Sequence, residues 1–139
     1  MYRLLEMTYD GIKETQAIRE YKTQNTLEGN FEEKYGTNME NNSDALLIGL
    51  DDIGNALYTG KTGSHEFQPR LFDAKTTNKE VANLAKYDTV DICHARFHKK
   101  KGEAINDDAS KQIVLRGFDG NGETLDYCHW VRAHVPVIE

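Results

Sequence analysis

The sequence predicts an α+β fold that is a tandem duplication of one ββαββ unit, with antiparallel sheets that are each packed by one helix. Three observations predict it: an internal repeat, an Asp-Gly turn near the start of the chain, and a Thr just before each expected helix. We assign residues 1–64 to the first repeat and residues 65–139 to the second, and we expect them to form one compact pseudo-symmetric domain.

The repeat is visible when residues 13–23, KETQAIREYKT, are placed above residues 79–89, KEVANLAKYDT. The same spacing places Phe31, Lys34 and Gly36 on Phe97, Lys100 and Gly102. With a small insertion, residues 44–55 match 111–122, and at the front residues 3–6 match 70–73. Any one of these matches could occur by chance, but chance is a poor explanation for so many matches in the same order along the chain.

Comparison of matching segments in the two repeats improves the secondary-structure prediction for each. Asp10-Gly11 favours a hairpin turn between strands at 2–9 and 12–21, because Gly accepts positive φ and Asp tolerates it. Residues 78–87 have helical propensity, yet their counterpart follows a turn and alternates, so we expect strands in both places. Further hairpin turns are expected at Asp51–Gly54 and Asp119–Gly122.

Two helices are expected, at about residues 24–40 and 90–106, with Thr23 and Thr89 as their N-caps. A helix needs an apolar stripe at helical spacing to pack on a sheet. We assign these stripes as Leu27, Phe31 and Met39 in the first helix, and Cys93, Phe97 and Ile105 in the second.

The third strand of each repeat is largely apolar on both faces. In the first repeat, Ala45, Leu47 and Gly49 alternate with Leu46, Ile48 and Leu50. One face can be covered by the helix of the same repeat, but the other needs a second cover. Either the two repeats cover each other, or a second chain does so in a homo-oligomer.

One strand face of the second repeat is more polar than its counterpart. If the turn at Gly120-Asn121 has two residues, Arg116 shares a face with Leu125, Tyr127 and His129. An Arg, a phenol and an imidazole suit a phosphate or carboxylate ligand, with Arg116 and Arg132 as donors. The alternative is that Arg116 is exposed at an edge or paired with an acidic side chain.

The second helix carries a basic cluster, which consists of Arg96, His98, Lys99, Lys100 and Lys101. The matching positions of the first repeat are Asn30, Glu32, Glu33, Lys34 and Tyr35. A solvated face explains many charge runs. The other two explanations are an anionic partner and an acidic helix of a neighbouring subunit.

Cysteine and histidine residues raise the question of a metal site. His94 and His98 lie four residues apart, on one helical face. However, Cys93 belongs to the core stripe, and Cys128 and His129 point to opposite faces of a strand. We therefore assign no metal ligand and no cofactor, and expect Cys93 to be a buried thiol.

Composition and motifs favour a non-enzymatic protein. The three serines, Ser43, Ser64 and Ser110, lie in turn-like segments without a nucleophile motif. The chain has 139 residues and a net charge of −6, which disfavours nonspecific nucleic-acid binding. The N-terminus is unlike a secretory signal and no apolar run is long enough to span a bilayer, so we expect a cytoplasmic location.

Residues 30–39, NFEEKYGTNM, and residues 95–105, ARFHKKKGEAI, are each followed by an apolar strand and a D-x-x-G hairpin. This pattern resembles small uncharacterised accessory proteins of phages and mobile elements of Firmicutes. The resemblance implies an accessory role, such as inhibiting a host defence protein or sequestering a small signal, and carries over no functional residue.

The combined prediction is a binding protein that acts on a protein or other macromolecular partner. The first alternative is a protein that sequesters a small anionic, nucleotide-like ligand. The second alternative is a small hydrolase or metal enzyme that uses His98 or His129.

Overall fold

The computed structural model describes residues 1–77 and 79–132. These residues form, in chain order, β1 (Tyr2–Tyr9), β2 (Glu14–Tyr21), α1 (Gln24–Glu40), β3 (Asp44–Leu50), β4 (Ala56–Thr62), β5 (Arg70–Thr76), β6 (Glu80–Lys86), α2 (Val90–Ile105), β7 (Gln112–Phe118) and β8 (Thr124–Val131). The chain is an α+β protein with two ββαββ units, as the repeat predicts, and β6 is a strand despite its helical propensity.

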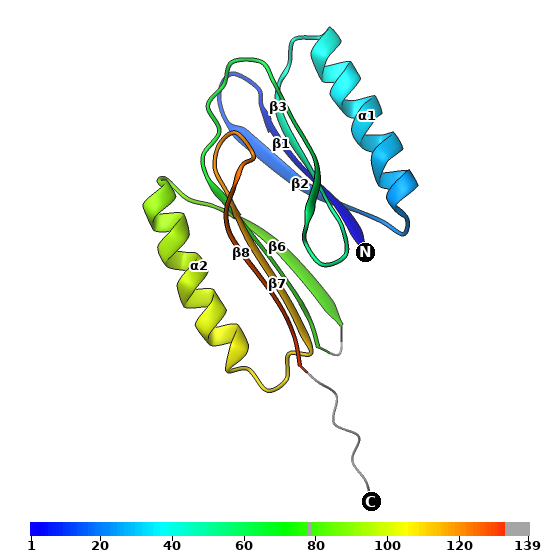
Figure 1. Cartoon of the computed structure of the whole chain (residues 1–139). Helices are drawn as coiled ribbons and strands as arrows, with labels where there is room; N and C mark the ends of the chain where they lie inside the picture. Colours follow the sequence, from blue (N-terminus) through cyan, green and yellow to red (C-terminus); the bar gives the residue numbers. More distant parts are fainter. Residues whose placement is uncertain (78, 133–139) are drawn as a thin grey trace, which may run out of the picture.

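Each unit has one four-stranded antiparallel sheet and one helix (Figure 1). The strand orders are β2-β1-β3-β4 and β6-β5-β7-β8, so equivalent strands occupy equivalent positions. The first and third strands of each unit are central, which explains why both faces of β3 and β7 are largely apolar.

The molecule has four layers, with α1 and α2 outside and the two sheets between them (Figure 1). We call the face of each sheet that meets the other sheet its inner face. The inner faces share one cluster of buried side chains, which includes Leu5, Met7, Leu46 and Ile48 from the first sheet and Phe72, Leu84, Val114 and Phe118 from the second. The two repeats therefore cover each other, and the apolar second face of β3 needs no second chain.

The outer faces are covered by the helices. Leu27 of α1 packs with Leu4 and Leu47, whereas Cys93 and Phe97 of α2 pack in the cluster of the second sheet. Thr23 and Thr89 are the N-caps, because their side chains accept hydrogen bonds from the N–H groups of Thr26 and Ile92. Each cap satisfies a backbone donor that the first helical turn leaves free.

The predicted stripe of α1 is wrong at its last position, because Met39 is 57% exposed. Twelve residues after Leu27, the helix has rotated about a third of a turn away from the buried face. Tyr35 packs instead with the buried cluster that contains Leu27. In α2, Ala104 joins the core cluster rather than Ile105, which is partly buried.

The turn between β7 and β8 is one residue longer than expected. The N–H of Asp119 donates to the carbonyl of Glu123 at 2.9 Å, which leaves a three-residue loop. The register then shifts at a bulge beside Gly117 and Phe118, so Arg116 pairs with Tyr127 rather than Leu125. The longer loop and the extra bulge residue together shift the register by two, which keeps Tyr127 and His129 on the face of Arg116. Leu125 packs instead on the outer face of the sheet, with the buried cluster that contains Cys93 and Phe97.

Candidate functional site

The basic cluster of α2 contains one lysine with a structural partner. Lys100 Nζ lies 2.9 Å from Asp73 Oδ2, and this hydrogen bond raises the pKa of Lys100 above its ordinary value. The equivalent lysine in the first unit, Lys34, lies 3.3 Å from Glu6 Oε2. The two pairs occupy matching positions, so Lys100 belongs to the way each helix is tied to its sheet.

The other members of the basic cluster do not tie α2 to its sheet. Arg96, His98 and Lys99 are exposed and Lys101 is partly exposed. Within residues 1–77 and 79–132, no carboxylate lies within 4.0 Å of Arg96, Lys99 or Lys101. Their charges face solvent rather than the fold.

Arg96 and Lys99 share one side of α2 with a large apolar residue. Ile92, Arg96 and Lys99 follow the spacing i, i+4 and i+7, which places them along one helical stripe. Ile92 is 42% exposed. We call these three residues the outward stripe of α2, and it combines two cations with exposed apolar area.

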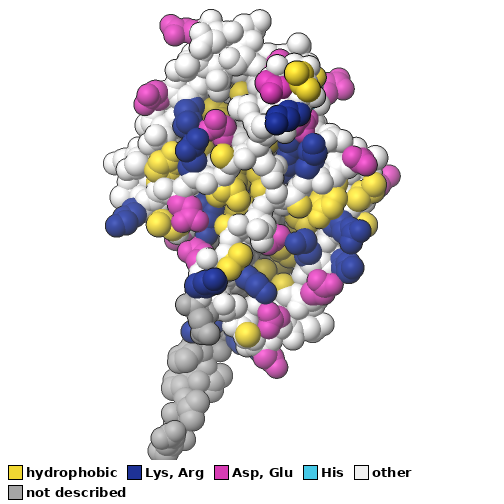
Figure 2. Space-filling model, turned by 180° about the vertical axis from the view of Figure 1, so that it is seen from behind, with side chains coloured by type: hydrophobic (Ala, Val, Ile, Leu, Met, Phe, Trp, Pro, Cys, Tyr) yellow, Lys and Arg dark blue, Asp and Glu magenta, His cyan; other side chains and the backbone are white. Residues whose placement is uncertain are grey.

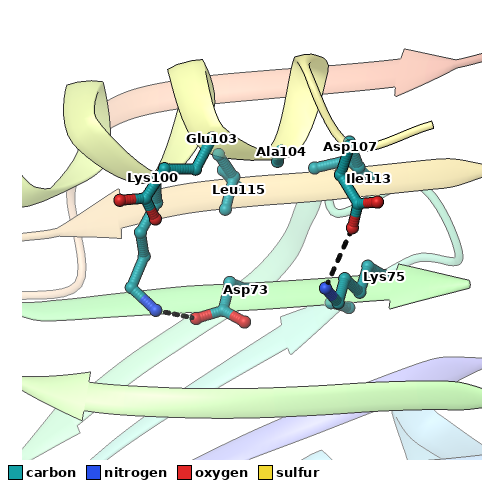
Figure 3. A pocket seen from close by; sticks show the side chains of 9 residues that line it. Asp73, Lys75, Lys100, Glu103, Ala104, Asp107, Ile113 and Leu115 are labelled. Atoms are coloured by element: carbon teal, nitrogen blue, oxygen red, sulfur yellow. Dashed lines mark hydrogen bonds and ion pairs between the residues drawn. The ribbon is translucent and has the colours of Figure 1, made fainter. Parts of the chain in front are cut away.

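A groove lies between α2 and the outer face of its sheet (Figure 3). It has a volume of about 190 Å³, and Lys100–Asp73 and Lys75–Asp107 ion pairs cross its rim. A similar groove beside α1 is lined by Glu6 and Lys34, the counterparts of Asp73 and Lys100. Because both units have the groove, we interpret it as a product of the fold.

The predicted anion site around Arg116 is filled by the protein itself. The Arg116 guanidinium lies 4.2 Å from the Tyr127 ring centroid and donates to Thr124 Oγ1 at 2.6 Å. The side chain is buried, and this desolvation lowers the pKa of Arg116 below its ordinary value. Tyr127 in turn donates to the carbonyl of Ile53 in the first unit at 2.8 Å. The Arg116–Tyr127 pair therefore joins the units.

The other two members of the predicted anion site, His129 and Arg132, have partners of their own. His129 contacts Gln112 across the strand pair, with 3.1 Å between the two Nε2 atoms. Arg132 lies against the end of α2, where it donates to the carbonyls of Ile105 and Asp107 and pairs with Asp108 at 3.1 Å. The fold does not bring Arg116 and Arg132 together around one ligand.

The thiols of Cys93 and Cys128 are both free. Cys93 is fully buried, its Sγ donates to the carbonyl of Arg70, and burial raises the pKa of the thiol to about 11. This confirms the buried core thiol that the stripe predicts, and a neutral thiol in such a place is a poor nucleophile or metal ligand.

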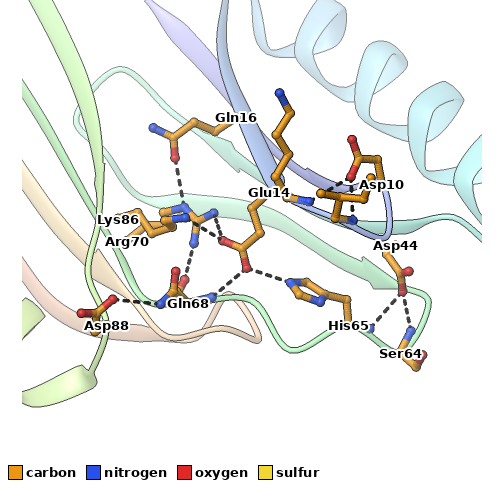
Figure 4. A network of polar contacts seen from close by, with 12 residues as sticks. Asp10, Glu14, Gln16, Asp44, Ser64, His65, Gln68, Arg70, Lys86 and Asp88 are labelled. Carbon is orange, nitrogen blue, oxygen red and sulfur yellow. Dashed lines mark hydrogen bonds and ion pairs between the residues drawn. The ribbon is translucent and has the colours of Figure 1, made fainter.

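A polar network that sequence reasoning missed joins the two units around Glu14 (Figure 4). Glu14 Oε2 lies 2.7 Å from Arg70 Nη2, and Oε1 lies 2.8 Å from His65 Nε2. Burial of Glu14 favours its neutral form, but the hydrogen bonds from His65 and Arg70 outweigh this effect and hold its pKa below the ordinary value. The His65 ring also stacks on Tyr9, with 3.6 Å between ring centroids.

The network has a pseudo-symmetric counterpart, in which Arg3 pairs with Glu80. Arg3 and Arg70 take the same place in the repeat, as do Glu14 and Glu80, so each arginine reaches the glutamate of the other unit. The repeated pairs were the signal in the sequence, but only packing of the two inner faces shows that they cross.

Charges of both signs cover the face opposite to that of Figure 1. Figure 2 shows Lys and Arg side chains interspersed with Asp and Glu, with hydrophobic side chains between them. Among the described residues, this face carries no broad basic patch of the kind that tracks a nucleic-acid backbone.

Comparison of the chain with family models, curated proteins and solved structures found no match. Among the described residues, neither helix has the length and apolar character needed to cross a membrane.

Proposed function

We propose that this protein is a non-enzymatic binding protein that contacts an acidic surface on a protein partner through the outward stripe of α2. The supporting observation is that Arg96 and Lys99 are exposed cations without an ionic partner among the described residues. A preformed helix face of this kind supplies a docking surface without a conformational change.

The first unit serves as an internal control for this proposal. Its helix has the same N-cap, the same place on the sheet and the same lysine–carboxylate tie as α2. Yet the positions that match Ile92, Arg96 and Lys99 are Thr26, Asn30 and Glu33. The fold therefore does not require cations or an apolar residue on this stripe, which favours a role outside the fold.

A protein partner agrees better with this surface than a nucleic acid does. The net charge of −6 opposes approach to a polyanion, whereas a local pair of cations can still complement a small acidic patch. Exposed Ile92 adds apolar area that a protein partner can bury. The resemblance to accessory proteins of phages and mobile elements favours an inhibitor of a host protein as the form of this function.

The small anionic ligand has less support. Arg116 is already buried against Tyr127, and Arg132 already binds the end of α2. A ligand that used both would have to replace these contacts.

The test is capture and affinity measurement with charge-reversed proteins. The tagged protein is used to capture partners from a lysate of its host, and candidates are then purified and titrated by calorimetry. We expect R96E/K99E to weaken the affinity of a true partner at least about 30-fold, since both cations face its acidic patch.

The matched control is K13E/K22E, which changes the net charge equally at two exposed lysines outside α2. This control should bind within about threefold of the wild type at the same ionic strength. Equal binding by R96E/K99E and the wild type, or equal weakening in both variants, would contradict the proposal.

A further inference from the structure

His98 of the basic cluster converges with a second histidine of α2, His94, and with one aspartate of β8, Asp126. The ligand atoms of His94, His98 and Asp126 all lie within 4.8 Å of one another. His94 Nδ1 is 2.9 Å from both carboxylate oxygens of Asp126, and the two imidazole centroids are 4.4 Å apart. Two nitrogens and a carboxylate therefore meet at one place on the surface.

Local structure accounts for this convergence. His98 lies four positions after His94, so the helix places both rings on one side, where they meet edge to face. Asp126 follows the β8 bulge and pairs with Gly117, on the face of the sheet that α2 covers. The histidine pair was visible in the sequence, but the carboxylate arrives from a separate element through a register shift.

The surroundings leave the carboxylate available to a cation. The Asp126 side chain is only 11% exposed, whereas that of His94 is 56% exposed. Among the described residues, no Lys or Arg nitrogen lies within 4.0 Å of Asp126, and its only ionic contact is His94. A largely desolvated carboxylate beside two imidazoles is a donor set that suits divalent transition metals.

The distances are compatible with one ion. Zinc bonds of about 2.0–2.2 Å in tetrahedral geometry place neighbouring ligand atoms roughly 3.3 Å apart. The hydrogen bond between His94 and Asp126 is about 0.4 Å shorter than this, so a bound ion would replace that bond and move the two side chains slightly apart, and rotation of the exposed His98 side chain would bring its imidazole to the same ion. Because both histidines face solvent, a fourth position stays open to water.

The first unit again serves as a control. The positions that match His94, His98 and Asp126 are Glu28, Glu32 and Tyr58, and Tyr58 packs with the aromatic ring of Phe31. The same helix and strand thus fold without this trio, so the fold alone does not call for it.

We propose that His94, His98 and Asp126 form a binding site for one divalent transition-metal ion of the zinc class, with three protein ligands and one water-accessible position. The proposal departs from the assignment made from the sequence, which gave the chain no metal ligand. The site is separate from the proposed partner surface, since neither Arg96 nor Lys99 belongs to it.

The test is calorimetric titration of the untagged, chelator-treated protein with ZnCl₂. We expect one site per chain, and at least about 100-fold weaker binding in H98A and D126N, since each loses one of three ligands. Replacement of zinc by Co²⁺ should give the visible absorption bands of a four-coordinate cobalt centre, and these bands should disappear in both variants.

H129A is the matched control, because His129 lies on the same strand but on the inner face, where its partner is Gln112. It should bind Zn²⁺ like the wild type. Circular dichroism melting curves in EDTA confirm that each variant is folded, so that lost binding is not lost structure. The proposal would be overturned if H98A and D126N bound Zn²⁺ as tightly as the wild type. It would also be overturned if the wild type showed several weak sites per chain or did not bind Zn²⁺.

Discussion

Two buried arginines join the units at the residue scale. Arg3 and Arg70 are each 1% exposed, and each meets a glutamate of the opposite unit. Burying a guanidinium is costly unless it is paired and hydrogen-bonded. The Arg70–Glu14 pair is more deeply buried than the Arg3–Glu80 pair, because the Glu14 side chain is 7% exposed and the Glu80 side chain is 40% exposed.

The substitution E14Q should therefore destabilise the protein by about 3 kcal/mol, because it leaves the buried Arg70 cation without its charge partner. The matched variant E80Q should cost less, since Glu80 is partly solvated and Glu20 also lies 4.0 Å from Arg3. Urea unfolding followed by circular dichroism measures both losses. Equal losses in the two variants would contradict the importance of burial at Glu14.

The same pair gives the direction of a pH dependence. The pKa of Glu14 is lower in the folded protein than its ordinary value of 4.5, so the folded state holds the carboxylate ionised. The resulting stabilisation is fully present above the unfolded pKa and is lost as the pH falls through the folded pKa. The difference in unfolding free energy between wild type and E14Q should thus be constant near neutral pH and shrink below about pH 4.5. A difference that grows on acidification would contradict this assignment.

At the scale of elements, the last hairpin of each unit, β3–β4 or β7–β8, packs on the inner face of the other unit. Gly54 has a φ of 85°, and a Cβ at this position would lie 2.3 Å from Val114 Cγ1. Gly122 has a φ of 83°, and its Cβ would lie 2.6 Å from Thr59 Cγ2. Both glycines thus serve the turn and the contact between the units.

We expect G54A to destabilise the protein by about 3 kcal/mol, from backbone strain and from overpacking against Val114. The control is G11A, since Gly11 also has positive φ but nothing lies within 4 Å of its Cβ position. That variant should lose only the strain energy, about 1 kcal/mol. Urea unfolding compares the two, and equal losses would show that the hairpin does not press on Val114.

At the scale of the whole molecule, one core serves both units. The central cluster takes side chains from both sheets, and the arginine–glutamate pairs and the hairpins cross the same boundary. Each isolated unit would expose its entire inner face to water. Folding should accordingly be cooperative across the repeat.

Thermal or urea unfolding should show a single transition, with coincident curves from circular dichroism and from the fluorescence of Trp130, the only tryptophan. F72A should shift both curves together and lose about 4 kcal/mol, because Phe72 is fully buried in the shared core. Two separate transitions, or a loss that hydrogen exchange confines to β5–β8, would contradict a shared core.

Much of the candidate surface could be predicted from the sequence, because a charge run on a helix depends only on local spacing. The exposure of Arg96 and Lys99 was foreseeable in this way, whereas the pairing of Lys100 required Asp73 from another strand. The Arg116 face could not be judged, since its burial depends on Tyr127 and on the hairpin of the other unit. Asp126 went unnoticed because nothing in its own segment marks it as a partner of His94 and His98.

The sequence by itself determined the two ββαββ units, the ends of their helices and the largely apolar character of both faces of β3 and β7. These features follow from turn residues, N-caps and side-chain periodicity, which act over a few residues. Tertiary structure alone decided that the inner faces cover each other, that each arginine crosses to the opposite glutamate, and that Asp126 meets two histidines. Such contacts depend on register and packing between distant segments, and a one-residue bulge is enough to change them.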